Sequence, residues 1–458
     1  MKDVSYLRIE AYSEHPEVRE MADLIVDSYL SELKRKNPEK YIRPARKLIA
    51  SIWIRDTDTF RFGTKTEYFG KKKRKQVWMT QPVRTLFRHM KKIGLISERV
   101  PYIPPELAFD GVGKSAIYQR SQSFKETLKD LSINDVIPDP DLPRIQLRNV
   151  QNFWEEIDQE TQNQEWFQVT EATLKRQDEL IAEANVNFPD GTPVHPLSWM
   201  YVRKFKEHFH LTGRFYAAFT TWKKEKRLSI RFNDVPACSL DLSQLHPTLI
   251  LRIRHGVEKE TGMFTGLNAD PYDMPSFKHL DRSIHKTLIN ACFNAKDIDS
   301  AARALMNAYY EWDAEENEYD CTIYKTKKKR VGTKCFPGNK KEALKYIEAF
   351  QLKHPQLADA LCTGIGLTLQ KLDSDFMLNV IRLANLAEIP VLPVHDEIVF
   401  PSNKQEHMEM ILGKAFSWTF GDAGSFGKLT VKRTILDDEP TPIFIGLDWD
   451  TDIGRPVK

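Results

Sequence analysis

The sequence predicts a mixed α+β protein of two to four domains, and three observations support this class. The chain has 458 residues, about three times the length of a common domain. Hydrophobic residues make up 41% and charged residues 29%, a globular composition that argues against disorder or a fibre. Apolar runs of helical period alternate with short apolar runs typical of strands. No apolar run approaches the roughly 18 residues that a membrane span needs, so we expect no membrane partner.

The charge of the chain is unevenly distributed. Residues 31–125 hold 23 lysines and arginines against 8 aspartates and glutamates, a local charge of +15, and the remaining residues carry −12. The net charge of +3 is therefore a near-cancellation, and a basic front with an acidic remainder indicates contact with nucleic acid. After the basic segment, residues 135–144 contain three prolines and three acids, which predicts a domain boundary.

The basic region is expected to be helical. Helical patterns cover residues 16–36, 44–54 and 80–93, and a glycine ends the third before a strand begins. The third helix places its apolar residues, as far as Ile93, on one face and its cations on another; these cations are Arg84, Arg88 and Lys91. Three helices followed by a strand resemble a winged helix-turn-helix, whose third helix enters the DNA major groove. A three-helix cluster with a solvated basic face is the alternative.

A run of five basic residues precedes that third helix. Lys72 and Lys73 lie inside it, and such cations follow a phosphate backbone because each contact releases a counterion. The same composition also suits a solvated loop or a nuclear address, so a nuclear location stays open.

The remaining chain alternates helices and strands. We expect helices over residues 151–187, 245–255, 281–295, 341–352, 367–386 and 405–420, and strands over 235–241, 391–400 and 429–449. An acidic stretch at 312–320 followed by a basic one at 325–330 predicts a hairpin whose arms complement each other in charge.

Acidic residues occur at the ends of two predicted strands. Asp241 ends the first, and Asp396 and Glu397 lie at the tip of the hairpin formed by the second. Carboxylates beside buried strands are costly unless a cation binds them. Side by side they would form an oxygen-ligand site for Mg²⁺, suited to phosphoryl transfer with two metal ions. A solvent-exposed hairpin is the alternative for the second pair.

Two cations are spaced to share one face of a predicted helix. Arg282 and Lys286 stand four residues apart, so both can hold a triphosphate, with Lys286 stabilising the leaving pyrophosphate. His285 lies off that face and is expected to pack. An isolated pair of this kind is more often a surface feature.

These segments occur in a fixed order. They read Asp-Leu-Ser-Gln-Leu-His from Asp241, Arg-x-x-x-Lys from Arg282, and Val-His-Asp-Glu from Val394. Thr-Gly-Arg, ending at Arg214, precedes the first, and a helix containing Gln370 precedes the third. In this order they resemble motifs A, B and C of family A DNA polymerases, together with the family's Thr-Gly-Arg segment and the glutamine helix before motif C.

The resemblance implies a right-hand polymerase, with a palm of antiparallel strands, helical fingers and a short thumb, beside the winged-helix-type domain. We expect the basic DNA-binding region over residues 1–135, a helical linker with the thumb over 136–211, and palm and fingers over 212–458. No stretch before residue 212 offers a proofreading nuclease.

The resemblance also implies roles for single residues. Asp241 and Asp396 would bind two Mg²⁺ ions, with Mn²⁺ as a substitute, and Glu397 would support them. Lys286 and Arg282 would hold the incoming nucleoside triphosphate. The primer–template would contact three further residues: His395 at the primer-terminal phosphate, and Arg214 and Gln370 in the minor groove.

The chain departs from the family at the nucleotide pocket. Gln244 matches the first motif, but His246 stands where the family has a glutamate that blocks the ribose 2′-hydroxyl. Asn290 and Asn294 replace the aromatics that contact the base pair, and Ala295 replaces a glycine. We therefore expect these departures to affect nucleotide selection more than metal chemistry.

The predicted function is that of a DNA-directed DNA polymerase, a nucleotidyltransferase for phage, plasmid or mobile-element replication in the bacterial cytoplasm. Two alternatives stay open: a single-subunit RNA polymerase or primase-like enzyme, and a DNA-binding initiator with a degenerate polymerase fold. An RNA template is a further option. The sequence predicts no particular protein partner.

Overall fold

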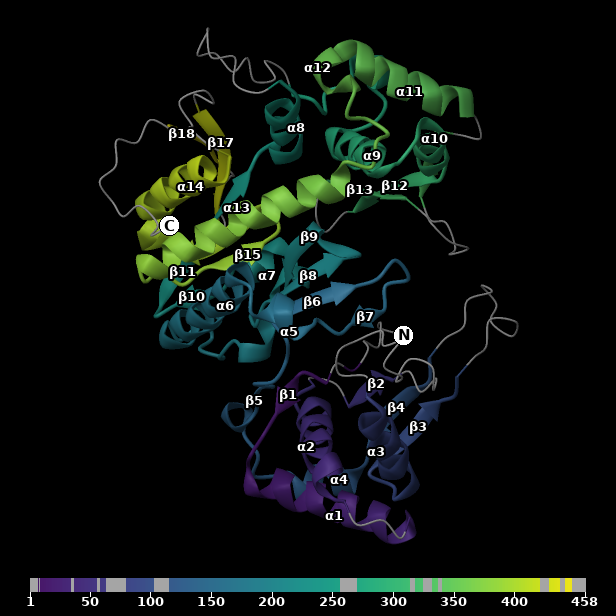
Figure 1. Cartoon of the computed structure of the whole chain (residues 1–458), viewed down its shortest axis with the longest axis vertical. Coiled ribbons are helices and arrows are strands. Elements are labelled where there is room, and N and C mark those ends of the chain that lie inside the picture. The colour runs from purple at the N-terminus through teal and green to yellow at the C-terminus, as the bar shows by residue number, and fades with distance from the viewer. Residues whose placement is uncertain are drawn as a thin grey trace. The chain divides into compact units, whose positions relative to one another are not determined.

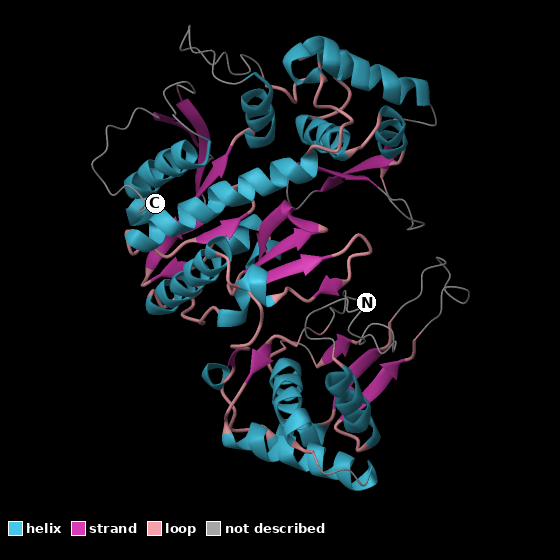
Figure 2. Cartoon of the chain, in the orientation of Figure 1, coloured by secondary structure: helices cyan, strands magenta, loops and turns pink. Residues whose placement is uncertain are grey.

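The computed structural model describes residues 7, 9–33, 37–55, 58–62, 80–102, 115–255, 270–313, 318–323, 332–336, 340–420, 428–436 and 441–446. It is 51% helix and 20% strand, with several small antiparallel sheets and a curled half-barrel sheet, which confirms the mixed α+β class (Figure 2). No helix among these residues is long and apolar enough to cross a membrane.

The chain forms two compact units. The N-terminal unit comprises Met1–Glu171, Val194–His208 and Tyr216–Thr221; the C-terminal unit comprises Ala172–Pro193, Phe209–Phe215 and Trp222–Lys458. Each unit is described separately below. The domain limits expected at residues 135 and 211 stay a prediction.

Three helices and a three-stranded antiparallel sheet begin the N-terminal unit. The elements are α1 (Pro16–Leu33), α2 (Glu39–Trp53), α3 (Gln81–Lys92), β2 (Thr59–Arg61), β3 (Ile96–Val100) and β4 (Ile117–Arg120), with the sheet order β2-β4-β3. The three predicted helices are confirmed, but α2 starts five residues before the expected residue 44. Pro44 is tolerated there because it lies close to the helix start, where few backbone bonds are lost.

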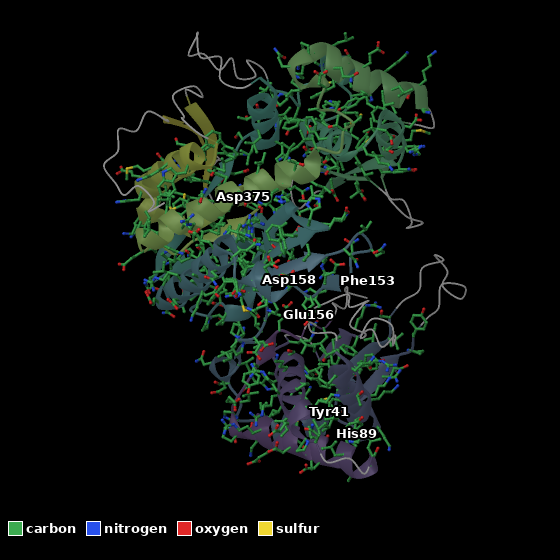
Figure 3. All side chains as sticks on the ribbon, viewed as in Figure 1. Tyr41, His89, Phe153, Glu156, Asp158 and Asp375 are labelled. Atoms are coloured by element: carbon green, nitrogen blue, oxygen red, sulfur yellow. The ribbon has the colours of Figure 1, made fainter. Side chains whose placement is uncertain are left out.

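Helix α3 packs as its pattern predicts. Leu86, Phe87 and Met90 are at most 1% exposed, and the ring of Phe87 stacks on that of Phe62 at 4.0 Å between centroids. Ile93, predicted on the same face, is 38% exposed because it is the C-cap, beyond the last turn that packs. His89, labelled in Figure 3, is buried as well, and its ring packs against that of Tyr29.

The proline-rich segment after these elements is fastened to the N-terminal unit. Its short strand β5 (Ile137–Pro138) pairs with β1 (Ala11–Tyr12). Asp139 is 6% exposed, and its carboxylate lies 2.5 Å from Lys47 Nζ of α2. Two backbone pairs and one buried ion pair therefore hold a segment that lacks extended regular structure.

The helix expected over 151–187 starts later than predicted. β7 (Trp154–Glu155) pairs with β6 (Ile145–Arg148), which also pairs in parallel with β8 (Val202–Lys206). The Asn149 side chain accepts hydrogen bonds from the amides of Gln151 and Phe153, closing a turn before β7. The helices that follow are α5 (Gln159–Gln162) and α6 (Glu165–Glu183).

The largest sheet belongs to the C-terminal unit. Its order is β15-β16-β11-β17-β18, with β10 also paired to β11. The strands are β10 (Arg231–Phe232), β11 (Val235–Leu242), β15 (Leu392–Val394), β16 (Glu397–Pro401), β17 (Lys428–Ile435) and β18 (Thr441–Gly446). The predicted strands at 235–241 and 391–400 are confirmed, and the closing strand is two paired strands. Because β11 lies inside the sheet, its predicted apolar run is buried.

The five helices predicted in this part of the chain are confirmed to within one residue at each end: α8 (Leu245–His255), α9 (Arg282–Asn294), α11 (Lys340–Lys353), α13 (Gly366–Leu386) and α14 (Gln405–Phe420). Three short helices were not predicted: α7 (Lys224–Leu228), α10 (Ile298–Met306) and α12 (Pro355–Ala358). Helices α13 and α14 lie side by side (Figure 1), and Phe376 of α13 packs on Phe416 and Phe420 of α14. At its start α13 passes close to α9: a Cβ on Gly366 would overlap the Asn294 amide.

The charged hairpin has arms that differ from the prediction. β12 (Ala308–Asp313) pairs with β13 (Glu318–Ile323), and β14 (Thr333–Lys334) pairs with the other edge of β12. The acidic stretch thus lies on both arms, with Asp313 opposite Glu318, and the basic stretch 325–330 falls outside the described residues. The apolar and aromatic residues of this stretch set the register, since Trp312 packs on Tyr319.

Candidate active site

The predicted acids of two distant segments meet through strand pairing. In the register of β11 and β16, Asp241 stands opposite Glu397. The amide of Leu242 donates to the carbonyl of Asp396 at 3.1 Å, so the turn of the hairpin lies against the end of β11. His395 adopts φ +60°, a left-handed conformation that makes this turn tight. The structure therefore brings all three acids to one end of the sheet.

Asp241 is surrounded by negative charge. Burial, followed by the charges of Asp396 and Glu397, raises its pKa to about 7, although Lys286 and Lys224 act in the opposite direction. Neither Asp241 nor Asp396 makes a side-chain hydrogen bond or ion pair with any described residue. Two carboxylates thus lie together without a partner, which favours the binding of a cation.

Glu397 differs from the two aspartates because basic residues match its charge. It is 6% exposed, and its carboxylate lies 2.7 Å from Arg227 Nη2 and 3.7 Å from Lys224 Nζ, both on α7. Our reading of the sequence missed these two partners. Their signal was present in the basic run that precedes β11, residues 223–227. Glu397 accordingly supports the site and is less available to a ligand.

The two cations of α9, which the sequence placed on one face, have different surroundings. Asp281 caps the helix by accepting from the Ser283 amide at 3.2 Å. Lys286 is exposed, forms no ion pair with a described residue, and lies close enough to Asp241 to oppose the rise in its pKa. Arg282 is paired with Asp270, with Nη2 3.3 Å from Oδ1. Of these two cations, Lys286 is therefore the one without a carboxylate partner among the described residues.

Asp270 organises the entrance to α9 and was also missed from the sequence. Besides Arg282, it accepts from Gln244 Nε2 at 3.4 Å and from the Tyr272 amide at 3.0 Å. The guanidinium of Arg282 lies over the Tyr272 ring, 5.3 Å from its centroid. Burial, and then the charge of Asp396, raise the pKa of Tyr272. Gln244 and Arg282, both predicted nucleotide ligands, are thus held on one carboxylate. Asn290, two turns further along α9 than Arg282, has a buried side-chain oxygen without a hydrogen-bond partner among the described residues.

A second cluster joins Arg214 and His246 to a residue that the sequence did not single out. Both contact the carboxylate of Asp373 on α13: Arg214 Nε lies 3.2 Å and His246 Nε2 2.9 Å from Oδ2. Gln370, one turn earlier on α13, makes no side-chain hydrogen bond with a described residue. For His395, burial and then the charge of Arg214 lower the pKa, so a neutral imidazole is favoured.

The predicted DNA contacts of the N-terminal unit have unequal surroundings. Arg84 is half-buried, and burial followed by the charge of Arg88 lowers its pKa. Lys91 is paired with Glu98 of β3. Arg88 is exposed and forms no ion pair with a described residue. Lys72 and Lys73 lie outside the described residues.

Comparison of the chain with protein-family models and with curated proteins finds no match. Among the described residues, no three histidine, cysteine, aspartate or glutamate side chains form a ready-made metal cluster. The chemistry of the site is therefore argued below from its own charges and contacts.

Proposed function

We propose that the chain is a template-directed nucleotidyltransferase, a compact DNA polymerase of the family A type. The observation that carries the proposal is the pair of unmatched aspartates, Asp241 and Asp396, beside an unmatched Lys286. A carboxylate pair with a facing ammonium is the arrangement that phosphoryl transfer from a triphosphate requires. In this proposal the large sheet is the palm, α9 belongs to the fingers, and the winged-helix-type region binds DNA.

The donor set suits magnesium. Asp241 and Asp396 offer oxygen ligands, and burial followed by the charges of Asp396 and Glu397 raises the pKa of Asp241. Both residues would hold the ions, which when bound would neutralise the triphosphate and assist deprotonation of the primer 3′-hydroxyl. Glu397, already paired with Arg227, joins β16 to α7, while the backbone pairing of β16 with β11 maintains the spacing of the aspartates.

The remaining residues bind and orient. Lys286 neutralises the leaving pyrophosphate and can donate a proton to it. Arg282 adds a second phosphate contact once it leaves Asp270, and Gln244 lies beside the same carboxylate. The neutral His395 donates one hydrogen bond to the primer-terminal phosphate without adding charge to the metal site.

For the N-terminal unit we propose a winged-helix mode of DNA binding. Helix α3 is followed directly by the antiparallel pair β3 and β4, which is the arrangement a recognition helix and wing require. Arg88 provides an exposed, unmatched cation on that helix.

Primer extension tests the catalytic proposal. We expect the wild-type chain to extend a DNA primer with Mg²⁺, and Asp396→Ala to lose roughly 10³-fold or more, because one ligand of the charge-stabilising site is gone. Asp359→Ala, an exposed aspartate at the end of α12, is the matched control and should retain activity. Equal activity of wild type and Asp396→Ala, or none in either with Mg²⁺ and Mn²⁺, contradicts the proposal.

The same assay separates the alternatives. Deoxynucleotides and ribonucleotides are supplied separately on DNA and RNA templates, with and without a primer. Extension only with ribonucleotides, or without a primer, indicates the RNA polymerase or primase-like enzyme. Tight DNA binding without extension indicates the initiator.

A further inference from the structure

Asp373 is a buried carboxylate that the proposed chemistry does not use. It lies within α13 and is 1% exposed. Its side-chain hydrogen bonds and ion pairs with described residues all go to Arg214 and His246, which come from two other segments of the chain. Burying an ionised acid costs free energy unless the acid is paired. We therefore expect Asp373 to serve Arg214 and His246, or the ligand that these two residues bind.

The hydrogen bonds fix the state of the imidazole. An ionised carboxylate is an acceptor only and a guanidinium is a donor only. His246 Nε2 lies 2.9 Å from Asp373 Oδ2 and 3.3 Å from Arg214 Nη2, so its proton points to the carboxylate and the arginine contact is not a hydrogen bond. Nδ1 makes no hydrogen bond with a described residue. Asp373 thus selects the Nε2–H form and leaves Nδ1 open.

The same turn of α13 also holds the backbone that leads to Arg214. The hydroxyl of Ser374 donates to the carbonyl of Thr212 at 3.1 Å. Thr212 and Gly213 have consecutive φ values of +64° and +72°, and this conformation is strained for threonine. Two neighbouring residues of α13 therefore fix both the backbone and the side chain of the Thr-Gly-Arg segment.

We propose that Asp373 is a positioning residue that holds Arg214, expected at the primer–template, and His246, expected at the nucleotide pocket, as one preassembled group. The inference rests on the proposed polymerase function. It is specific to this chain because it couples His246, a departure from the family, to a helix residue outside the motifs. Asp373 touches neither Asp241, Asp396 nor Lys286, so its loss should weaken binding more than the chemical step.

A double-mutant cycle on primer–template binding tests the coupling. Fluorescence anisotropy is measured for wild type, Asp373→Asn, Arg214→Gln and the double variant, with Asp359→Asn as the control. We expect each single change to raise the Kd about 10-fold or more, since a displaced positioning group costs up to about 100-fold. The double variant should bind no more weakly than the weaker single variant. Additive losses, or a Kd of Asp373→Asn equal to wild type, overturn the inference.

The rate of primer extension distinguishes a loss of positioning from a general loss of structure. In single-turnover extension at saturating primer–template, Asp373→Asn should keep a rate within about threefold of wild type, because metal ligands and Lys286 are untouched. A large fall in this rate with unchanged Kd overturns the inference while leaving the polymerase function intact. Absence of extension and binding in the wild type removes the proposed function and the inference together.

The tautomer of His246 provides a test that does not depend on a folded Asp373 variant. Side-chain ¹⁵N spectra of ¹⁵N-histidine-labelled wild type, assigned with His246→Gln, report which ring nitrogen carries the proton. A proton on Nε2 supports the inference, and a neutral ring protonated on Nδ1 alone overturns it. Where Asp373→Asn folds, the Nε2–H preference should be reduced in that variant.

Discussion

Two regions of the molecule treat buried charge in opposite ways. In the N-terminal unit, two acids that are partly or wholly shielded from solvent have basic partners: Asp139 pairs with Lys47, and Asp58 with Arg120. At the end of the large sheet in the C-terminal unit, Asp241 and Asp396 have none. Matched pairs hold structure together, whereas burial and neighbouring negative charge raise the pKa of the unmatched Asp241 and favour an external cation.

The same contrast divides the cations. Lys91 and Arg282 each have a carboxylate partner, whereas Arg88 and Lys286 have none among the described residues. A cation that is already paired loses part of its attraction for a phosphate. The structure therefore distinguishes cations that the sequence pattern did not: Arg88 and Lys286 are expected to attract phosphate more strongly than Lys91 and Arg282.

Among the cations, the largest effect is expected at Lys286. Lys286→Ala should lower the extension rate about 10²- to 10³-fold, because it removes the unmatched positive charge beside the acids. Primer–template binding should change little. Single-turnover kinetics and anisotropy measure the two quantities, with Lys345→Ala on the exposed face of α11 as the control. A loss confined to DNA binding would contradict the assigned role.

A matched acid should matter for stability and not for chemistry. Asp139→Asn leaves Lys47 without its buried partner and should reduce the free energy of unfolding by about 3 kcal/mol. The matched control is Asp141→Asn, whose exposed ion pair with Arg43 should contribute less than about 1 kcal/mol. Urea titration gives both values. If Asp139→Asn left the free energy of unfolding unchanged but abolished primer extension, Asp139 would act in the chemistry and not in the stability of the fold.

The elements around the reacting acids could be predicted because their patterns are local. Helices α8 and α14 have the predicted bounds, and the apolar strands on either side of His395 define a turn from sequence alone. Asp241 and Asp396 were predictable because each ends a strand, and two ends of paired strands meet. The pairing itself was inferred from the family resemblance and not from the patterns.

What sequence reasoning missed depends on contacts between distant segments. Asp373 looks like any acid in a helix until Arg214 and His246, 159 and 127 residues away, are placed beside it. Arg227 meets Glu397 across 170 residues. Hydrophobic periodicity says which face is buried, but it does not say which polar group will share that burial. For this reason the core was more predictable than the charge pairing.

A smaller effect concerns the pH dependence of stability. The folded-state pKa of Asp241 is raised to about 7, above the model-peptide value of 3.8, so without metal the folded chain retains a proton that the unfolded chain loses. This contribution to stability is fully present below about pH 4 and is lost as the pH rises towards 7. Asp241→Asn should therefore match wild type in Tm near pH 4 and exceed it by a few degrees at pH 8 in EDTA.

Magnesium supplies the control for that prediction. Added Mg²⁺ should raise the Tm of wild type more at pH 8 than at pH 5, because a proton competes for the same oxygens, and should affect Asp241→Asn less. Thermal scans across pH measure both. A Tm difference between the two proteins that does not vary with pH would show that Asp241 ionises normally.

The smallest expected effect is a difference in DNA binding between two cations on α3. Arg88 is exposed and unmatched, so Arg88→Ala should weaken DNA binding about 3- to 10-fold and reduce the salt slope of log Kd by about 0.9. Lys91 already pairs with Glu98, so Lys91→Ala should change the affinity less than about twofold and the slope very little. Anisotropy of the full chain on duplex DNA across salt concentrations measures both slopes. Equal slopes for the two variants would mean that DNA displaces Glu98 from Lys91, and pairing within the free chain would then no longer predict which cations bind phosphate.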